Sequence, residues 1–598
     1  MTTTATGRAV PVERPVLGSA TGTAAWGSDA VVDVLQAIDT PYLPMNPGSS
    51  FRGLHDSVVN YAGNSGPQLL LCLHEEIAVS LAHGWSKATG RLGVAAVHDL
   101  VGLMHASMAV YDAFCDRTPL LLLGGSGPND PARRRPIDWL HSATTQAQLV
   151  RDYVVWDAEP ATPEATVADL VRARQRALSA PRGPAYVSLD AGVQEQPLHT
   201  PVPLPELSRH APAPPIAPDP EALDAAARVL AGARRPVVVA GRVGLDPRIV
   251  TPLRELVEVL GAPYRDDRNW VVLPTSHPQN CTGDERLLTE ADVVLAVDVV
   301  DLPALLARRG RGRRSEGEGT ARADGPAVID LSHGDLGLRP WSNAFASPLA
   351  RDVHLLADPV LGLRLLLEAL RPLVDGRAAD ERREATASRA RALLADQQDA
   401  LHQRWNGAPI APARLVAETW AAVRDVDHLL CLRNTRTWPH GVWELPGAGS
   451  YLGRSGGGGV GYGPGALVGG ALAARDRGQL GVGIIGDGDL LMAAGALWTA
   501  SHYGIPALVV VNDNGSFYND EPHQAAVARE RGRPTENSWI GMRISDPAVD
   551  IASLARSYGC YVEGPVDDRD GLAPAFRRAV AEAVAGATAV VHVRTAPQ

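Results

Sequence analysis

Two oxygen-bearing side chains, Asp487 and Asn514, lie 27 positions apart, and each follows an apolar run of the sequence. Between them the pattern predicts a helix over Leu490–Tyr503 and a second strand over Ala507–Val511. In a parallel βαβ unit both strands end at the same edge of the sheet, so the two side chains meet where ligands of open α/β sheets bind. A carboxylate and an amide oxygen at that edge suit a hard, octahedral cation that also holds phosphate oxygens.

Glycines surround this predicted cation site. Gly486 and Gly488 flank Asp487, and the lack of a side chain there lets backbone N–H groups approach a phosphate. The N-terminus of the following helix also favours negative charge. An ordinary βαβ unit with a glycine-rich turn is the alternative interpretation. Asp489 is unexpected beside a phosphate, and no physical reason for it is visible in the sequence.

The composition is that of a large globular protein. The chain has 598 residues, of which 45% are apolar, so it is long enough for three or four domains. The net charge of −11 is mild for this length and argues against nucleic-acid binding. No apolar run reaches the ~18 residues of a membrane-spanning helix, and no signal-peptide core is present. We therefore expect no membrane association and a cytoplasmic location.

The five cysteines are widely separated and form no CxxC pair. They lie mostly in apolar runs, which favours reduced thiols in the core over a disulfide framework or a metal cluster. They are Cys72, Cys115, Cys281, Cys431 and Cys560.

Apolar runs alternate with helical patterns along most of the chain, which is typical of doubly wound α/β domains. A proline-rich stretch from Thr200 to Pro220 cannot continue a helix and indicates an extended linker. A charged, alanine-rich stretch from Ala378 to Trp405 predicts a helical linker. We predict a fold of three doubly wound α/β domains. In order, they and their linkers are a first domain (25–198), the Pro-rich linker (199–220), a central Rossmann-like domain (221–375), the helical linker (376–409) and a last domain (410–598).

The stretch 483–518 resembles the cofactor motif of the thiamine diphosphate-dependent decarboxylase and carboligase superfamily, in which a Gly-Asp-Gly turn and an Asn-rich turn flank one helix. In that family the aspartate, the second Asn of the turn and a backbone carbonyl two residues later hold Mg²⁺ against the diphosphate. The resemblance assigns these roles to Asp487, Asn514 and the carbonyl of Ser516. A shift of the turn by one residue would make Asp513 the ligand in place of Asn514. The cofactor contacts implied in the first turn are Gly486, Asp487, Gly488 and Asp489.

The segment Leu71–Ala78 resembles part of the same family's pyrimidine-binding domain. The resemblance gives Glu75 the role of the glutamate that hydrogen bonds to N1′ of the aminopyrimidine, which favours the imino tautomer that deprotonates C2. The alternative interpretation is that Glu75 or Glu76 only interacts with a helix N-terminus. In this family the pyrimidine-binding and diphosphate-binding domains meet across a subunit interface. The resemblance therefore implies a homodimer or a dimer of dimers.

Three further matches resemble benzoylformate decarboxylases: the turn Asn46–Ser49, the position of His98 23 residues after Glu75, and the helix Ala496–Ala500. In that family the serine orients the substrate carboxylate and the histidine moves protons, so the resemblance gives these roles to Ser49 and His98. A turn serine and a structural histidine are the alternatives. The family's second histidine, from the central domain, has no clear match. Acetolactate synthases share the His-Glu turn and the Gly-Asp-Gly unit equally well.

Two segments upstream of the Gly-Asp-Gly turn resemble further cofactor contacts of the family. The glycine-rich run Ser455–Gly463 contains one bulky apolar residue, Val460, at the position that holds the cofactor in its bent conformation. Valine is smaller than the family's usual Leu, Ile or Met, and a glycine run is otherwise a flexible loop. The turn Asn434–Thr437 matches the hydroxyl-rich turn at the diphosphate, with Thr435 as the donor.

The resemblance implies an enzyme that uses thiamine diphosphate and Mg²⁺ to decarboxylate a 2-oxo acid through a C2-bound enamine. Protonation of the enamine makes a decarboxylase, and addition to a second carbonyl acceptor makes a carboligase. A non-catalytic cofactor-binding protein is one alternative. A nicotinamide-dependent dehydrogenase is another, because Gly241–Gly244 is a weak dinucleotide signal. FAD in the central domain is possible but not indicated, and the donor and acceptor substrates are left open.

Overall fold

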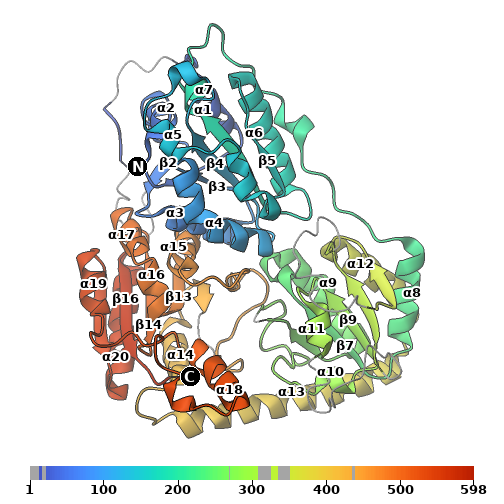
Figure 1. The fold of residues 1–598 in the computed structure, drawn as a ribbon. Helices are drawn as coiled ribbons and strands as arrows, with labels where there is room; N and C mark the ends of the chain where they lie inside the picture. Colours follow the sequence, from blue (N-terminus) through green and yellow to red (C-terminus); the bar gives the residue numbers. More distant parts are fainter. Residues whose placement is uncertain are drawn as a thin grey trace. The chain divides into compact units, whose positions relative to one another are not determined.

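The computed structural model describes residues 13–16, 22–268, 270–307, 325–334, 350–433 and 438–597. Within these residues lie three parallel β-sheets, each with helices beside it (Figure 1). They confirm the predicted fold class of three α/β domains. The chain forms two compact units, and the larger one contains both the first and the last sheet. The larger unit comprises residues 1–213, 404–438 and 454–598, and the smaller one residues 214–403 and 439–453.

The first sheet joins strands that are all parallel to their neighbours. Its strand β4 is rich in leucine and almost wholly buried, as expected where helices cover both faces of a parallel sheet. Strands β2 and β3 are each followed at once by a long helix, so their carboxyl ends carry the first residues of α3 and α4. The strand order is β2 (Gln68–Leu71), β1 (Tyr42–Met45), β3 (Gly93–Val97), β4 (Leu120–Ser126), β6 (Pro184–Asp190) and β5 (Trp156–Ala158). The longer helices are α1 (Gly27–Ala37), α3 (Glu75–Thr89), α4 (Asp99–Cys115) and α6 (Pro163–Leu178).

The last sheet contains the predicted βαβ unit. Strands β13 and β14 are parallel neighbours, and Gly486 at the end of β13 pairs with Asn512 near the end of β14. The helix predicted over Leu490–Tyr503 is present as two shorter helices, because the chain leaves the helical path at Ala493. The strand order is β12 (His428–Arg433), β13 (Leu480–Gly486), β14 (Ala507–Asp513), β16 (Thr588–Arg594) and β15 (Tyr561–Val566). The helices are α14 (Pro412–Val423), α15 (Tyr462–Asp476), α16 (Asp487–Met492), α17 (Gly495–His502), α18 (Asp520–Glu530), α19 (Ile551–Ser557) and α20 (Leu572–Val584).

Helices α3 and α15 join the first and last sheets into one unit. They cross with their backbones in contact, and glycine makes this possible. A Cβ at Gly84 of α3 would stand 2.1 Å from the carbonyl oxygen of Ala466, and a Cβ at Gly469 of α15 would stand 1.9 Å from that of Leu81. The two sheets are therefore held at a fixed spacing by a glycine-lined helix pair.

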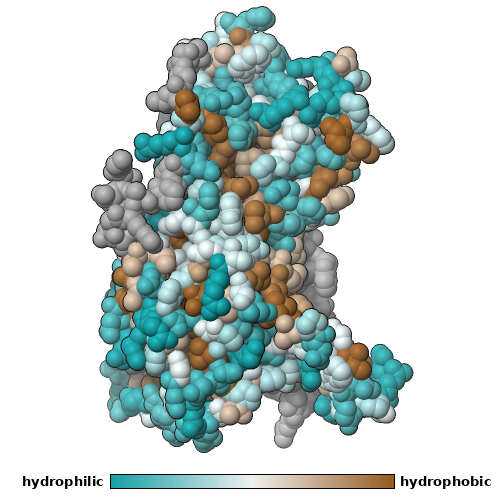
Figure 2. All heavy atoms as spheres, turned by 90° about the vertical axis from the view of Figure 1, so that its left-hand side faces the viewer, coloured by the Kyte–Doolittle hydropathy of each residue, from teal (hydrophilic) through white to brown (hydrophobic). Residues whose placement is uncertain are grey.

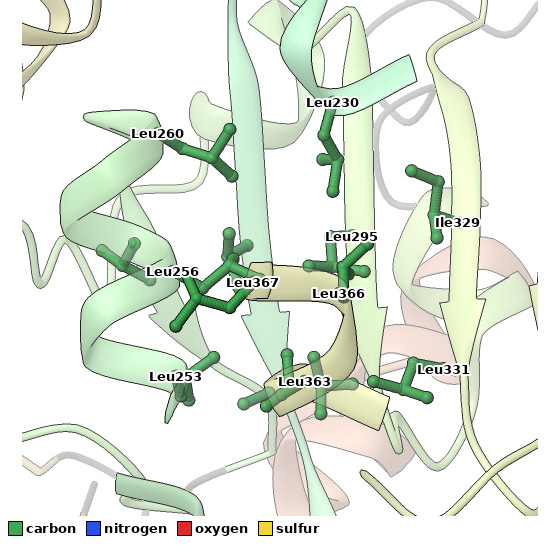
Figure 3. Packing of buried hydrophobic residues seen from close by; sticks show 14 of the residues in the cluster. Leu230, Leu253, Leu256, Leu260, Leu295, Ile329, Leu331, Leu363, Leu366 and Leu367 are labelled. Carbon is green, nitrogen blue, oxygen red and sulfur yellow. The ribbon is translucent and has the colours of Figure 1, made fainter. Parts of the chain in front are cut away.

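The smaller unit is built on a parallel sheet of its own. Figure 3 shows leucines of α9 and α12 directed at one another and at the strands, which forms an aliphatic core. A Cβ at Gly241 would stand 2.4 Å from the carbonyl oxygen of Asp298, so packing alone accounts for this glycine. The strand order is β11 (Val353–Leu355), β10 (Ala327–Leu331), β9 (Val293–Val297), β7 (Pro236–Ala240) and β8 (Tyr264–Asp266). The helices are α8 (Pro220–Ala231), α9 (Val250–Leu260), α10 (Leu287–Glu290), α11 (Leu302–Ala307), α12 (Pro359–Leu370) and α13 (Gly376–Arg404).

The surface is mixed in character. On the face shown in Figure 2, hydrophobic residues form small groups among hydrophilic ones, which is ordinary for a protein surface. Among the described helices, none combines the length and the apolar composition that crossing a bilayer requires. None of the five cysteines forms a disulfide within the described residues, and four of them are buried.

Candidate active site

Two aspartates face each other at the carboxyl ends of β13 and β14. Asp487 is the first residue of α16 and is 3% exposed. Burial, together with the charge of Asp513, raises the pKa of Asp487 to about 7. Burial also acts to raise the pKa of Asp513, but the imidazole of His592, 2.7 Å away, outweighs it and lowers that pKa. One ionised carboxylate therefore lies beside a second carboxyl group that is costly to ionise.

Asp487 of this pair fits a divalent cation. Oδ2 of Asp487 is buried and has no hydrogen-bond partner among the described residues, and such an atom is costly unless an ion or a donor meets it. Asn514 lies next to Asp513, and its Oδ1 accepts the N–H of Ser516 at 3.0 Å, which leaves one lone pair for a metal. The hydroxyl of Ser516 donates to Oε1 of Glu521 at 2.5 Å, so this side chain is already engaged. The residues present thus match the oxygen-donor set of a hard cation.

Asp489 has a structural role that the sequence did not reveal. Its Oδ1 accepts the N–H of Gly461 at 2.7 Å and the N–H of Gly463 at 3.3 Å. These two N–H groups lie in the first turn of helix α15 and have no acceptor within the helix. Asp489 therefore caps α15, and this holds Val460 just ahead of the helix, where the residue is 44% exposed. Burial and the charge of Asp489 also raise the pKa of Glu76.

The glycine-rich run before α15 is tied to helix α4 of the first sheet. Oδ1 of Asp112 accepts the hydroxyl of Ser455 at 2.6 Å and the N–H of Gly457 at 2.7 Å. Burial raises the pKa of Asp112 to about 7. Lys87 of α3 donates both to Asp116 and to the carbonyl of Arg454, at 2.6 and 3.1 Å. The first domain thus fixes a run that would be flexible in isolation.

Thr435, which the resemblance places at the diphosphate, lies outside the described residues.

Glu75 is the first residue of α3 and is 5% exposed. Its Oε2 lies 3.0 Å from Nδ1 of His105, which comes from α4. The ring of His74 stacks on that of His105 with centroids 4.8 Å apart, and Nδ1 of His74 accepts the N–H of Glu76 and so caps α3. His74, not Glu75, is therefore the capping side chain. His105 was not singled out in the sequence, although it lies only seven residues after His98.

His98 links the end of β3 to α4 and has a partner on each ring nitrogen. Nδ1 lies 2.8 Å from Oγ of Ser50, and Nε2 lies 3.3 Å from Nδ1 of His141, whose ring meets it edge-on. Burial, and next the neighbouring His141, lower the pKa of His98. Ser50 is buried, whereas Ser49 is exposed and its Oγ lies 3.4 Å from Nη2 of Arg135. The structure thus places Ser50 against His98, a contact that the sequence did not indicate.

The turn before Ser49 is shaped by the imidazole of His98. A Cβ at Gly48 would stand 2.1 Å from Cγ of His98, so only glycine fits at this position of the turn. Beside the imidazole, Asp99 is 2% exposed, and burial raises its pKa to about 7 although a hydrogen bond from Ser50 partly offsets this. Glu75 follows β2 and His98 follows β3, so both lie at the same edge of the first sheet, and the charge of Glu75 acts to raise the pKa of His98.

A polar cavity of about 280 Å³ opens at the ends of β4 and β6. Asp138 of α5 (Asp138–His141) lines it, and so do Glu159 and Asp190. The amide oxygen of Gln146, also in the lining, is buried and has no hydrogen-bond partner among the described residues. The cavity therefore offers acceptors to a molecule that carries N–H or O–H donors.

Two family models match the chain. "Thiamine pyrophosphate enzyme, N-terminal TPP binding domain" matches residues 25–149, and "Thiamine pyrophosphate enzyme, C-terminal TPP binding domain" matches residues 434–593. The first range includes Glu75 and His98, and the second includes the Asp487 and Asn514 turns. The resemblance found in the motifs is confirmed at the level of these two domains.

Relatives match over most of the chain. Benzoylformate decarboxylase of Pseudomonas aeruginosa is 26% identical over 509 residues, covering 82% of this chain and 85% of the relative. A probable 2-ketoarginine decarboxylase of the same organism is 27% identical over 534 residues, covering 84% and 83%. A probable acetolactate synthase large subunit of Methanocaldococcus jannaschii is 22% identical over 583 residues, covering 89% and 86%.

Solved structures share the fold. The thiamine diphosphate-dependent 4-hydroxybenzoylformate decarboxylase of Rhodococcus jostii superposes with a TM-score of 0.74 at 21% identity, covering 96% of this chain and all of that one. The benzoylformate decarboxylase of Polynucleobacter necessarius superposes with a TM-score of 0.75 at 18% identity, covering 96% and 99%. All three sheets thus have counterparts in enzymes of known structure.

Proposed function

We propose that this chain, which belongs to the thiamine diphosphate-dependent 2-oxo acid decarboxylase and carboligase superfamily, completes its reaction by protonation and releases an aldehyde. The matches establish the coarser statement, that the chain is a thiamine diphosphate-dependent lyase or transferase acting on 2-oxo acids. The observation that carries the finer proposal is the imidazole of His98, held between Ser50 and His141 at the end of β3. A positioned imidazole is the common donor of protons in enzymes near neutral pH.

When bound, thiamine diphosphate supplies an electron sink for the carbon that loses CO₂. We assign its anchoring to the last domain, where Asp487, Asn514 and the carbonyl of Ser516 would hold Mg²⁺. The unpartnered Oδ2 of Asp487 supports this assignment. Gly486, Gly488 and Asp489 belong to the same turn, and the capping bonds of Asp489 make it a support of the site. We also propose the roles that the resemblance implies for Val460, which would hold the cofactor bent, and for Thr435, which would donate to the diphosphate.

Glu75 is proposed to hold a proton at the pyrimidine ring of the cofactor. Its side chain is almost fully buried and has His105 on one side. A carboxyl group in this position can exchange a proton with a ring nitrogen without competition from bulk water. His105, with 47% of its side chain exposed, fixes the orientation of the carboxyl group from the solvent side.

His98 is proposed to donate the proton that ends the reaction. Ser50 fixes its orientation through Nδ1, and burial keeps its pKa low, so that the neutral imidazole is the resting form. The family resemblance assigns Ser49 to the substrate carboxylate, and its exposure beside Arg135 agrees with a role in binding an anion.

The donor substrate is proposed to carry a polar substituent. The cavity beside α5 presents Asp138 and the unpartnered oxygen of Gln146, which favour a tail with hydrogen-bond donors over a plain hydrocarbon. The similarity to a 2-ketoarginine decarboxylase supports a tail of this kind. A carboligase that joins two 2-oxo acids is the second candidate, favoured by the match to acetolactate synthases.

We further propose a cytoplasmic homodimer or dimer of dimers, in which the first domain of one subunit completes the site of its partner. The family resemblance supports this arrangement.

The experiment that tests the function is a screen of 2-oxo acids with and without an added aldehyde, reading CO₂, aldehyde and acyloin together. We expect aldehyde as the main product, and donors with polar tails as the best substrates. His98→Ala should slow aldehyde formation by roughly 10²–10⁴-fold and acyloin formation much less. Equal losses in both products would mean that His98 is structural or acts before the two outcomes divide. Acyloin as the main product of the wild type would favour the carboligase.

A further inference from the structure

The strongest unassigned feature is a second imidazole beside His98. His141 ends the short helix α5, and its Nδ1 lies 3.3 Å from Nε2 of His98. The rings meet at an interplanar angle of 86° with centroids 5.2 Å apart, so they approach edge-on and not in a stack. Two neutral imidazoles in this position must share one proton, because one nitrogen of the pair donates and the other accepts. Either tautomer gives an N–H···N bond.

The two imidazoles differ in their access to solvent. His98 has a side-chain exposure of 13%, while His141 is partly exposed. On the far side of His98, Ser50 and the carboxyl of Asp99 are almost fully buried. The pair therefore forms a path that leads from solvent through His141 to His98 and ends at a buried acid.

We infer that His141 is a positioning residue that passes protons between solvent and His98, so that the first domain itself supplies the second imidazole of the active site. This inference rests on the proposed role of His98. A proton from solvent adds to Nε2 of His141, and the proton on its Nδ1 moves to Nε2 of His98. His98 then carries a proton on each nitrogen. It gives the proton on Nε2 to the substrate carbon and keeps the one on Nδ1, next to Ser50. Both rings end neutral, and no electron donor or acceptor is needed.

The charged groups around His98 suit this transfer. His141 and Arg135 disfavour a lasting positive charge on His98, while Glu75 and Asp99 limit the cost of a brief one. Asp138, one turn before His141 on α5, is bonded to Arg135 at 2.7 Å and so balances it. A short-lived imidazolium is what a proton relay requires.

The test begins with the apoprotein, so that it does not depend on the reaction. Nuclear magnetic resonance of ¹⁵N-labelled histidine gives the pKa of His98 in the wild type and in His141→Ala. We expect this pKa to rise in the variant, because the repulsion of the second imidazole is lost and water reaches Nε2. Leu140→Ala, at an exposed position of the same helix, should leave it unchanged. An unchanged pKa in His141→Ala, or the same shift in Leu140→Ala, would overturn the inference.

Kinetics of the holoenzyme separate a relay from a structural support. In His141→Ala we expect kcat to fall about tenfold with little change in KM, and added imidazole to restore part of the loss. His141→Asn keeps a hydrogen-bonding group near the position of Nδ1 but takes up no proton, so it should stay slow. Full activity in His141→Asn would show that only packing matters. A shifted pKa with no effect on turnover would overturn the relay through His141, while the role of His98 is tested separately by His98→Ala.

Discussion

Buried carboxyl groups mark the ends of the strands that carry the site. Asp487 and Asp513 face each other at the ends of β13 and β14, and Glu75 follows β2 with His105 as its partner. An isolated buried carboxylate is costly, so each of these groups needs a cation, a donor or a proton nearby. Their burial is therefore better explained by ligands than by stability.

The proposed metal ligands are tested by removing one oxygen donor at a time. Asp487→Ala and Asn514→Ala should each abolish Mg²⁺-dependent binding of thiamine diphosphate, because the diphosphate loses its bridge to the protein. Titration calorimetry with the cofactor, with and without Mg²⁺, measures the loss. Asp425→Ala, at an exposed position, is the control. If Asp513→Ala is damaging and Asn514→Ala is harmless, Asp513 is the ligand in place of Asn514. The alignment of this turn with the family motif is then wrong by one residue.

Glu75 is tested without altering its size. Glu75→Gln should keep cofactor affinity within about tenfold, or roughly 1.4 kcal/mol, because one side chain among many contacts changes. The exchange of the cofactor's C2 proton with D₂O should slow by roughly 10²–10⁴-fold. Glu76→Gln is the neighbouring control, since burial and the charge of Asp489 act on Glu76, whereas His105 contacts Glu75. Unchanged exchange in Glu75→Gln would remove Glu75 from the reaction.

At the scale of helices and strands, the positions of the site residues follow from how segments are anchored. Asp489 caps α15 from 28 residues downstream, and Asp112 of α4 fixes the glycine-rich run. Local patterns were enough to predict the strand ends, and hence the positions of Asp487, Glu75 and His98. They were not enough for Ser50 and His141, which are brought to His98 by the packing of separate segments. The break at Ala493 was also missed, because the sequence around it keeps a high helix propensity.

Asp112 gives the anchoring of the glycine-rich run a pH dependence. Its pKa rises from the ordinary value of 3.8 to about 7 on folding, so the folded chain binds more protons than the unfolded one between these values. Stability from this group is thus present at low pH and lost as pH rises through about 7. Asp112→Asn keeps an acceptor for Ser455 and Gly457 without the proton. The thermal midpoint of the wild type minus that of Asp112→Asn should be larger at pH 5 than at pH 8. An equal difference at both pH values would contradict this account.

At the scale of the whole molecule, the two halves of the site lie on different sheets of the larger unit. Glu75 and His98 belong to the first sheet, and the proposed metal ligands belong to the last. Within one chain Glu76, beside Glu75, lies near Gly461, and the charge of Asp489 in the Gly-Asp-Gly turn acts on it. In the proposed assembly these halves meet between subunits instead, so each chain would contribute to two sites.

Mixed dimers test this arrangement. Glu75→Gln and Asp487→Ala chains are each expected to be inactive alone. Unfolded together and refolded, they should recover about one quarter of wild-type activity, because half of randomly formed dimers contain both chains and each has one intact site. Each variant refolded alone is the control. No recovery in dimers shown to be mixed would place both halves of the site in one chain.

The glycine contact between α3 and α15 also bears on how the chain is made. Twelve of the 15 residues of α3 are buried, and the helix that covers its glycine face begins only at Tyr462. At a synthesis rate of about 5–20 residues per second, α3 leaves the ribosome roughly 20 to 75 s before α15 does. During that interval the first domain presents an uncovered apolar helix face. Nascent chains stopped before residue 462 should therefore bind holding chaperones or aggregate, whereas chains released after α15 has emerged should not.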